Sequence, residues 1–193
     1  PPAGELYQGG IQRDRFEPFV KLVREKMTVL HLDSPVDYRE RRTEEDLSTH
    51  YVTPLGSAAH RWANRVFLKL CNHTIPSCEI LEVKGREILV EAAANGAARF
   101  TFSELCERPH GAEDYLAIAA RFHTVLIENV PVMNYDRRNE AKRFMTMIDT
   151  LYDKDITLYM TAAAPPENLY AGHDHSFEFQ RTVSRLKEMG LGT

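Results

Sequence analysis

Apolar residues spaced three to four positions apart predict two amphipathic helices in the first part of the chain. One runs from Arg13 to Lys26, with Pro18 tolerated only near its first turn. After this helix, residues 28–32 predict a short strand that ends at Asp33-Ser34-Pro35. The second helix spans residues 55–74, and its expected buried stripe is Ala58, Trp62, Val66, Phe67 and Leu70.

Two short runs rich in apolar residues, joined by a turn signal, predict a β-hairpin in the middle of the chain. The runs 80–83 and 86–90 are joined by Lys84-Gly85, where glycine supplies the positive φ of a tight turn. Residues 98–102 predict a third strand, and Ser103 opens a short helix. Because side chains alternate along a strand, we expect one face of the hairpin to pack against one apolar surface through Leu81, Val83, Ile88 and Val90.

The pattern then changes to alternating helices and strands. The expected elements are a helix over 113–122, a strand over 123–127, a helix over 136–153, a strand over 156–160 and a terminal helix over 178–189. Two strands joined by a long helix are typical of a parallel βαβ unit. The predicted fold class is therefore mixed α/β, with a parallel βαβ unit, a small β-hairpin element and flanking helices.

Composition narrows the functional classes. The 193 residues are 43% hydrophobic, enough for a core, and carry 24 basic against 28 acidic side chains, for a net charge of −4. That balance argues against nucleic-acid binding through bulk charge. The longest apolar runs reach about ten residues, half of the ~20 that a membrane span needs. Three cysteines form no closed disulfide framework, which favours a reducing compartment.

The sequence contains few candidates for a metal or phosphate site. Cys71, His73 and Cys78 lack the fourth ligand of a structural zinc site, so buried thiols are the favoured interpretation and no metal site is predicted. No Gly-x-x-x-x-Gly-Lys-Ser/Thr phosphate loop occurs. Glu128 ends a predicted strand, where an acid that organises Mg²⁺ could lie, but one carboxylate without a phosphate cradle is not a complete site.

Two pairs of arginines stand at unusual helix positions. Arg13 and Arg15 open a helix, where the macrodipole disfavours cations, so they suit a phosphate or carboxylate across an interface. Surface pairs with Asp14 and Glu17 are the alternative. Arg181 and Arg185 share one helix face and repel each other slightly, which suggests a shared anionic partner. Their alternative partners are Glu178 and Glu188.

Several blocks together resemble the ZapE family of AAA+ ATPases and its mitochondrial, lactation-elevated-type relatives. They occur in the family's order, and residues 40–79 match least. The blocks are Pro1-Pro2, Glu5-Leu6-Tyr7, Gly9-Gly10-Ile11-Gln12-Arg13-Asp14-Arg15-Phe16, Leu32-Asp33-Ser34, Phe102-x-Glu104-Leu105-Cys106, Pro109-x-Gly111-Ala112-x-Asp114-Tyr115, Arg138-Asn139-Glu140-Ala141-Lys142-Arg143-Phe144 and Phe177-Glu178-Phe179-x-Arg181-Thr182-Val183-Ser184-Arg185-Leu186.

The resemblance implies that the chain is the C-terminal half of such a P-loop protein, because the family's phosphate loop, Walker B strand and sensor-one Asn lie upstream of the Pro-Pro pair. It divides the chain into the end of the ATPase core with the arginine-finger region (1–38), a charged loop, helix and hairpin (39–112), and a βαβ unit with the terminal helix (113–193). Arg13 corresponds to the arginine finger, with Arg15 as its backup. Arg143, Arg181 and Arg185 are candidates for the lid arginine that senses nucleotide.

The resemblance also implies a function for the whole protein. It would hydrolyse ATP with Mg²⁺ in a ring-like oligomer and act on protein partners at the membrane surface, in the cytoplasm or, in a eukaryote, the mitochondrial matrix. The bacterial relatives concern cell division and the mitochondrial ones protein quality control. The half without a phosphate loop would be inactive alone. A non-catalytic interaction module, which binds a partner through the hairpin and residues 39–46, is the alternative.

Overall fold

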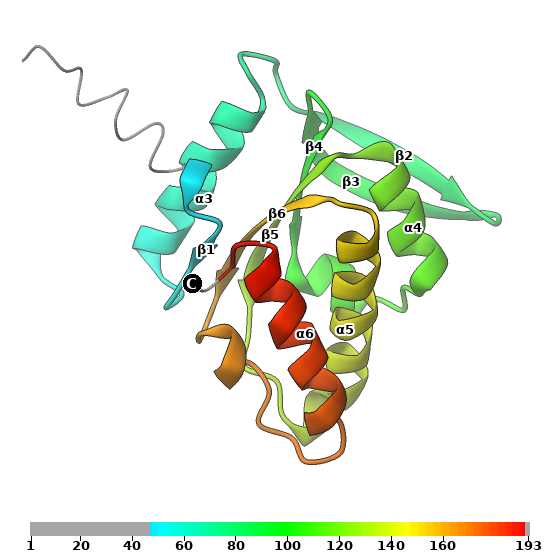
Figure 1. The fold of residues 1–193 in the computed structure, drawn as a ribbon. Coiled ribbons are helices and arrows are strands. Elements are labelled where there is room, and N and C mark those ends of the chain that lie inside the picture. The colour runs from blue at the N-terminus through cyan, green and yellow to red at the C-terminus, as the bar shows by residue number, and fades with distance from the viewer. Residues whose placement is uncertain (1–46, 192–193) are drawn as a thin grey trace, which may run out of the picture. The chain divides into compact units, whose positions relative to one another are not determined.

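A six-stranded sheet with helices on both faces organises the part of the chain that the computed structural model describes, residues 47–191 (Figure 1). The strand order is β1-β6-β5-β4-β3-β2. The strands are β1 (Tyr51–Val52), β2 (Ser77–Val83), β3 (Arg86–Ala94), β4 (Ala97–Thr101), β5 (Thr124–Val130) and β6 (Thr157–Ala162). The helices are α3 (Ser57–Leu70), α4 (Ala112–Arg121), α5 (Arg138–Asp153) and α6 (Ser176–Glu188), with short turns η1 (Ser103–Glu107), η2 (Tyr135–Arg137) and η3 (Pro166–Asn168).

The predicted parallel βαβ unit is confirmed in β5, α5 and β6. Strands β5 and β6 pair in parallel, with Val125 opposite Leu158 and Ile127 opposite Met160. Both strands lie in the middle of the sheet, and nearly all of their side chains are buried. Strands that are covered on both faces have nearly continuous apolar sequences, and this pattern made both strands predictable from the sequence. Strands β4 and β1 continue the parallel part of the sheet on either side.

The predicted hairpin is confirmed as β2 and β3, and β4 extends it antiparallel into the same sheet. Lys84 and Gly85 both have positive φ, as a two-residue turn with the twist of the strands requires. The expected face also packs as predicted, because Val83, Ile88 and Val90 are buried in the main core and Leu81 contacts it. Strands from residues 39–112 and from residues 113–193 thus belong to one sheet. The expected division of the chain at residues 38 and 112 stays a prediction.

The two faces of the sheet have separate cores. The larger core lies beneath α4, α5 and α6 and includes Ile127, Phe144 and Phe179. The smaller core lies beneath α3, where Trp62 and Phe67 belong to the same cluster as Leu126 and Tyr159 of the central strands. The sheet is therefore sandwiched between helices, as its doubly buried strands require.

The structure corrects two details of the predicted α3. The helix ends at Leu70 rather than at residue 74, because Asn72 and His73 adopt positive φ values that a helix cannot accommodate. Ala59, not Ala58, faces the core, because the buried stripe follows the line of Trp62, Val66 and Phe67. The short strand β1 was not predicted, since two residues carry no periodic signal.

The remaining predictions for the N-terminal region, a helix over 13–26 and a strand over 28–32, fall outside the described residues. Among residues 47–191, no helix has the length and apolar character to cross a membrane.

Candidate functional site

The carboxyl ends of the parallel strands place several polar side chains close together on the α3 side of the sheet. Helix α3 follows β1 directly, so its first turn lies at the same edge as the ends of β4, β5 and β6. In open α/β sheets, ligands bind outside the carboxyl ends of the strands. This edge is therefore the first place to look for a site in residues 47–191.

Glu128 is the centre of this polar group. Its side chain is 5% exposed, and one oxygen accepts a hydrogen bond from Arg99 Nε while the other lies 3.4 Å from His60 Nδ1. Arg99 comes from β4, where the register places it two residues before the residue opposite Glu128, and His60 comes from the first turn of α3. Arg99 also stacks over the Phe67 ring, 5.6 Å from its centroid. Burial of a carboxylate is costly unless such a partner pairs with it and donates a hydrogen bond.

The backbone beside Glu128 departs from regular strand geometry. Asn129 has φ +62°, and its N–H donates to Thr161 Oγ1 on β6 at 3.0 Å instead of continuing the ladder. Asn tolerates this left-handed conformation better than most residues. The turn leaves the Asn129 side chain exposed at the strand end, next to the buried hydroxyl of Thr161.

Chemically, this group is an internal ion pair. Arg99 engages one oxygen of Glu128 with a charge-assisted hydrogen bond, and the other oxygen faces His60. Within residues 47–191, no cluster of three or more His, Cys, Asp or Glu side chains is arranged to hold a metal ion. The buried Cys71 and the exposed Cys78 lie at opposite ends of the turn that follows α3.

Of the three candidate lid arginines, Arg143 connects two elements. Its Nη1 donates to the carbonyl oxygen of Cys106 at 2.9 Å and so attaches α5 to the end of η1. The Cys106 thiol beneath it is buried, which raises its pKa well above the ordinary value. This thiol is therefore a poor nucleophile and packs as a small buried apolar side chain.

Arg181 and Arg185 share an anionic partner, as their spacing suggested, and that partner is Asp149 on α5. Arg185 Nη1 lies 2.5 Å and Arg181 Nη2 3.7 Å from its carboxylate oxygens. Arg185 also meets Asp153 at 3.2 Å and stacks over the Tyr152 ring. The alternative partners are engaged elsewhere, Glu178 with His175 and Glu188 with the Tyr152 hydroxyl.

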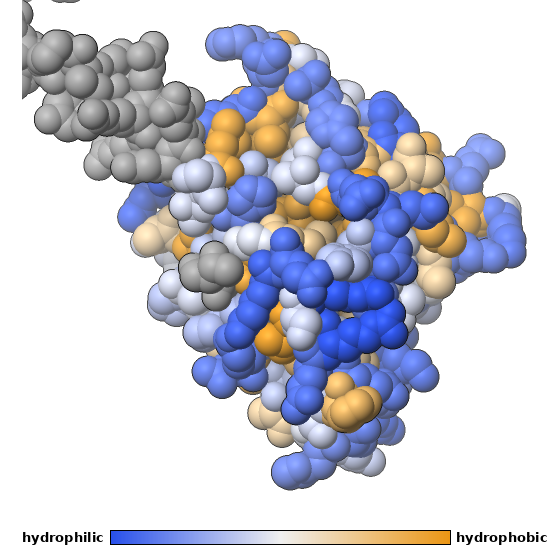
Figure 2. Space-filling model, viewed as in Figure 1, coloured by the Kyte–Doolittle hydropathy of each residue, from blue (hydrophilic) through white to orange (hydrophobic). Residues whose placement is uncertain are grey.

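Arg143 thus bonds a backbone carbonyl, whereas Arg181 and Arg185 pair with a carboxylate on α5. The face of the molecule over α5 and α6 is predominantly hydrophilic (Figure 2).

Arg13 and Arg15 lie outside the described residues, so their expected role stays a prediction.

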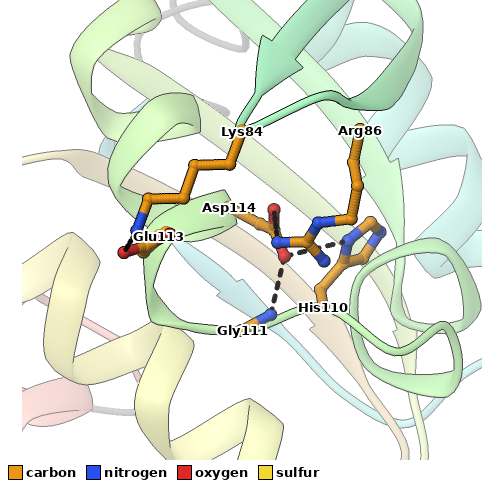
Figure 3. A network of polar contacts seen from close by, with 6 residues as sticks. All are labelled: Lys84, Arg86, His110, Gly111, Glu113 and Asp114. Carbon is orange, nitrogen blue, oxygen red and sulfur yellow. Dashed lines mark hydrogen bonds and ion pairs between the residues drawn. The ribbon is translucent and has the colours of Figure 1, made fainter.

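A second polar network joins the hairpin to α4 (Figure 3). Asp114 is 1% exposed and accepts hydrogen bonds from Arg86 Nη2 at 3.0 Å and from the Gly111 N–H at 2.8 Å, with His110 at 3.6 Å. The Gly111 contact satisfies a free donor at the start of α4. The next residue, Tyr115, donates its hydroxyl to the Leu105 carbonyl at 2.9 Å. This network accounts for the Gly111-Ala112-x-Asp114-Tyr115 block in physical terms.

Sequence reasoning missed most of these contacts. Glu128 was noted, but its partners Arg99 and His60 are 29 and 68 positions away in the sequence, and nothing in the sequence links them. Asp114 stood in a quoted block without a role. Its position three residues after Gly111, at the start of a helix, is the signal that could have identified it as a cap.

Taken together, the described residues form a mixed α/β sheet with a parallel centre, polar groups at its carboxyl edge and a hairpin tied to one helix. A family model, that of the AFG1-like ATPases, matches residues 1–192. The chain therefore belongs to the AFG1-like ATPase family.

Curated relatives agree with this assignment. The chain is 33% identical to the cell division protein ZapE of Escherichia coli K12 over 97% of its own length and 50% of that protein. It is 32% identical to lactation elevated protein 1 homolog B of Danio rerio, over 97% of the chain and 44% of the relative. The chain thus spans about half the length of the curated relatives it matches. No solved structure matches it.

Proposed function

We propose that this chain is the C-terminal half of an ATPase that hydrolyses ATP with Mg²⁺ in a ring-like oligomer. The observation that supports this most strongly is the family match over residues 1–192, together with coverage of about half of each relative. In this proposal the phosphate loop belongs to the other half of the protein. The name of the bacterial relative supports a role in cell division, and the proposed clients are protein partners at the membrane surface.

Arg13 is the proposed arginine finger, with Arg15 as its backup. A finger stabilises the charge that develops on the transferred phosphoryl group and reaches a nucleotide held by the neighbouring subunit. Arg143, Arg181 and Arg185 remain candidates for a lid arginine. For Arg185 this role would require that phosphate replace its partners Asp149 and Asp153. Arg181 is held less tightly, because its side chain is exposed and its single carboxylate partner, Asp149, lies 3.7 Å away.

In the full-length protein, Arg13→Ala should cut ATP turnover about 10³-fold while ATP binding stays nearly unchanged. Arg13→Lys should be almost as slow, because an ammonium cannot span two phosphate oxygens. Steady-state turnover and equilibrium nucleotide binding measure the two effects. Mixing with a phosphate-loop variant whose Arg13 is intact should restore turnover, since finger and nucleotide then come from different subunits. Full turnover by the alanine variant would assign Arg13 a structural role and move the search to Arg15.

The 193-residue chain alone should neither bind ATP tightly nor hydrolyse it, because its sequence has no phosphate loop. Titration calorimetry with Mg²⁺–ATP measures this directly. A micromolar nucleotide site in the chain alone would contradict the proposed division of labour between the two halves.

A further inference from the structure

The hairpin presents two different faces. One packs on the main core, whereas the opposite face carries Ile80 and Leu89, which are direct cross-strand neighbours. These two side chains are 57% and 39% exposed. Large apolar side chains paired on an exposed sheet face are more informative than single exposed ones, because together they form the centre of an uncovered surface.

The helices that cover the rest of the sheet leave this surface open. Helix α4 packs against β2 from the core side, in front of the strand in Figure 1. On the other side, the cluster beneath α3 reaches β3 at Ala92 and Ala94 and does not include Ile80 or Leu89. Among residues 47–191, no helix covers this end of the sheet on that side. Antiparallel strands can leave one face in water when that face is polar, but here the open face carries two large apolar side chains.

The charges around the two apolar residues all have one sign. Glu82 lies directly opposite Glu87, and Glu91 lies on the same face of β3. None of these three carboxylates has an ion-pair partner in the described part of the chain. Like charges directly opposite each other on a sheet destabilise it, so the arrangement costs stability unless a cation lies beside it.

The basic residues of the hairpin do not offset these charges, because α4 engages them. Lys84 pairs with Glu113 and Arg86 with Asp114, both on the core side of the hairpin (Figure 3). In the part of the chain that the structure describes, the charges on the uncovered face are therefore all acidic and surround an apolar centre. We call it the hairpin face, defined by Ile80, Glu82, Glu87, Leu89 and Glu91.

We propose that the hairpin face is a docking surface for a basic amphipathic helix of a partner protein. An apolar stripe on such a helix would cover Ile80 and Leu89, and flanking Lys or Arg side chains would reach Glu82, Glu87 and Glu91. The helix would complete the layer that α3 begins on this side of the sheet. Charge complementarity argues for this occupant over an acidic or neutral one. The proposal goes beyond ATP hydrolysis and does not depend on it.

A synthetic helical peptide with a leucine stripe flanked by lysines serves as the probe. It should bind the full chain saturably, and the Glu82→Lys/Glu87→Lys variant should weaken binding at least about tenfold at low ionic strength. The matched control, Asp136→Lys/Asp155→Lys, changes net charge equally at exposed acids elsewhere and should leave binding nearly unchanged. Equal weakening by both variants would show attraction to bulk charge only and overturn the proposal, as would equal binding of a leucine–glutamate peptide.

The native thiol Cys78 offers a second measurement. Cys78 is exposed on β2 two residues before Ile80, whereas Cys71 and Cys106 are buried, so a thiol reagent labels it selectively. Saturating lysine peptide should slow its alkylation. A photo-cross-linker attached at Cys78 should, in cell extract, join this face to a basic amphipathic segment identified by mass spectrometry. Cross-links to a second copy of this chain, to acidic segments or to no protein would each overturn the proposal.

Discussion

At the scale of single residues, two acidic side chains show how burial decides the role of a charge. Glu128 and Asp114 are both almost completely buried, and each is held by an arginine from a neighbouring strand. Replacing either acid removes a buried acceptor and leaves its donors without that partner, which costs more than loss of an exposed ion pair. Both sites should therefore be sensitive to substitution, unlike most of the surface ion pairs.

Asp114→Ala should lower the free energy of unfolding by about 1–2 kcal/mol. It removes the buried acceptor of the Gly111 N–H and the partner of Arg86, whose side chain is 53% exposed and can be solvated instead. Glu113→Ala, one position away, removes only the exposed pair with Lys84 and should cost at most about 1 kcal/mol. Urea unfolding of the two variants measures the difference. Equal losses would mean that the network of Figure 3 contributes no more than a surface pair.

At the scale of elements, tight turns set the antiparallel half of the sheet. The β3–β4 connection is Asn95-Gly96, with φ of 49° and 72°, and the β2–β3 connection is Lys84-Gly85, with φ of 48° and 78°. Positive φ at both central residues matches the twist of the strands that follow. The two glycines differ in their surroundings, because a Cβ at Gly96 would overlap the His123 ring and one at Gly85 would meet open space.

Gly96→Ala should therefore destabilise the protein more than Gly85→Ala. The latter pays only for a side chain at positive φ, about 1 kcal/mol. At Gly96, displacement of His123 should add about 1–2 kcal/mol, since Gly96 also accepts hydrogen bonds from the His123 and Thr124 amides. Thermal and urea unfolding of both variants test this order. A Gly85 variant as unstable as the Gly96 variant would show that the conformational cost alone dominates.

At the scale of the whole molecule, the two cores on opposite faces of one sheet bury several phenols. Burial raises the pKa of Tyr115 and of Tyr159, and burial together with Asp174 raises the pKa of Tyr170 to about 12. Tyr115 and Tyr159 donate their hydroxyls to backbone carbonyls, and Tyr170 donates to Asp174, so the neutral forms are the ones that fit the fold.

These shifts predict a loss of stability at high pH. Unfolded tyrosines release protons near their ordinary pKa of 10.0, while the folded protein retains them, so the folded state binds more protons and its stability falls as pH rises above about 10. Below that pH the phenols contribute no pH dependence. Urea unfolding at pH 8 and pH 11 should show the fall, and Tyr115→Phe should make it shallower while losing about 1 kcal/mol at pH 8. An unchanged slope in that variant would exclude Tyr115 as a contributor.

Local pattern alone determined most of the elements. Apolar periodicity located α3, α4, α5 and α6. The Lys84-Gly85 turn between two apolar-rich runs located the hairpin, and the alternation of side chains along a strand identified the face that it buries. These patterns predict the elements correctly because each depends only on residues within a few positions of one another. Apolar periodicity did not show the end of α3, because it does not report the positive φ values of Asn72 and His73. It did not show the two-residue β1 either, because that strand is defined by its pairing with β6, far along the chain.

Tertiary structure alone decided what the charged residues do. Asp149 as the shared partner of Arg181 and Arg185, the Arg99–Glu128–His60 group, and the engagement of Lys84 and Arg86 by α4 all join residues from different elements. A sequence specifies charge and spacing, but Coulomb and hydrogen-bond energies depend on separations of a few ångströms that packing sets. Within residues 47–191, the same packing leaves the hairpin face acidic and without a covering helix. No single stretch of sequence shows this property, because the pairing of β2 with β3 brings its residues together.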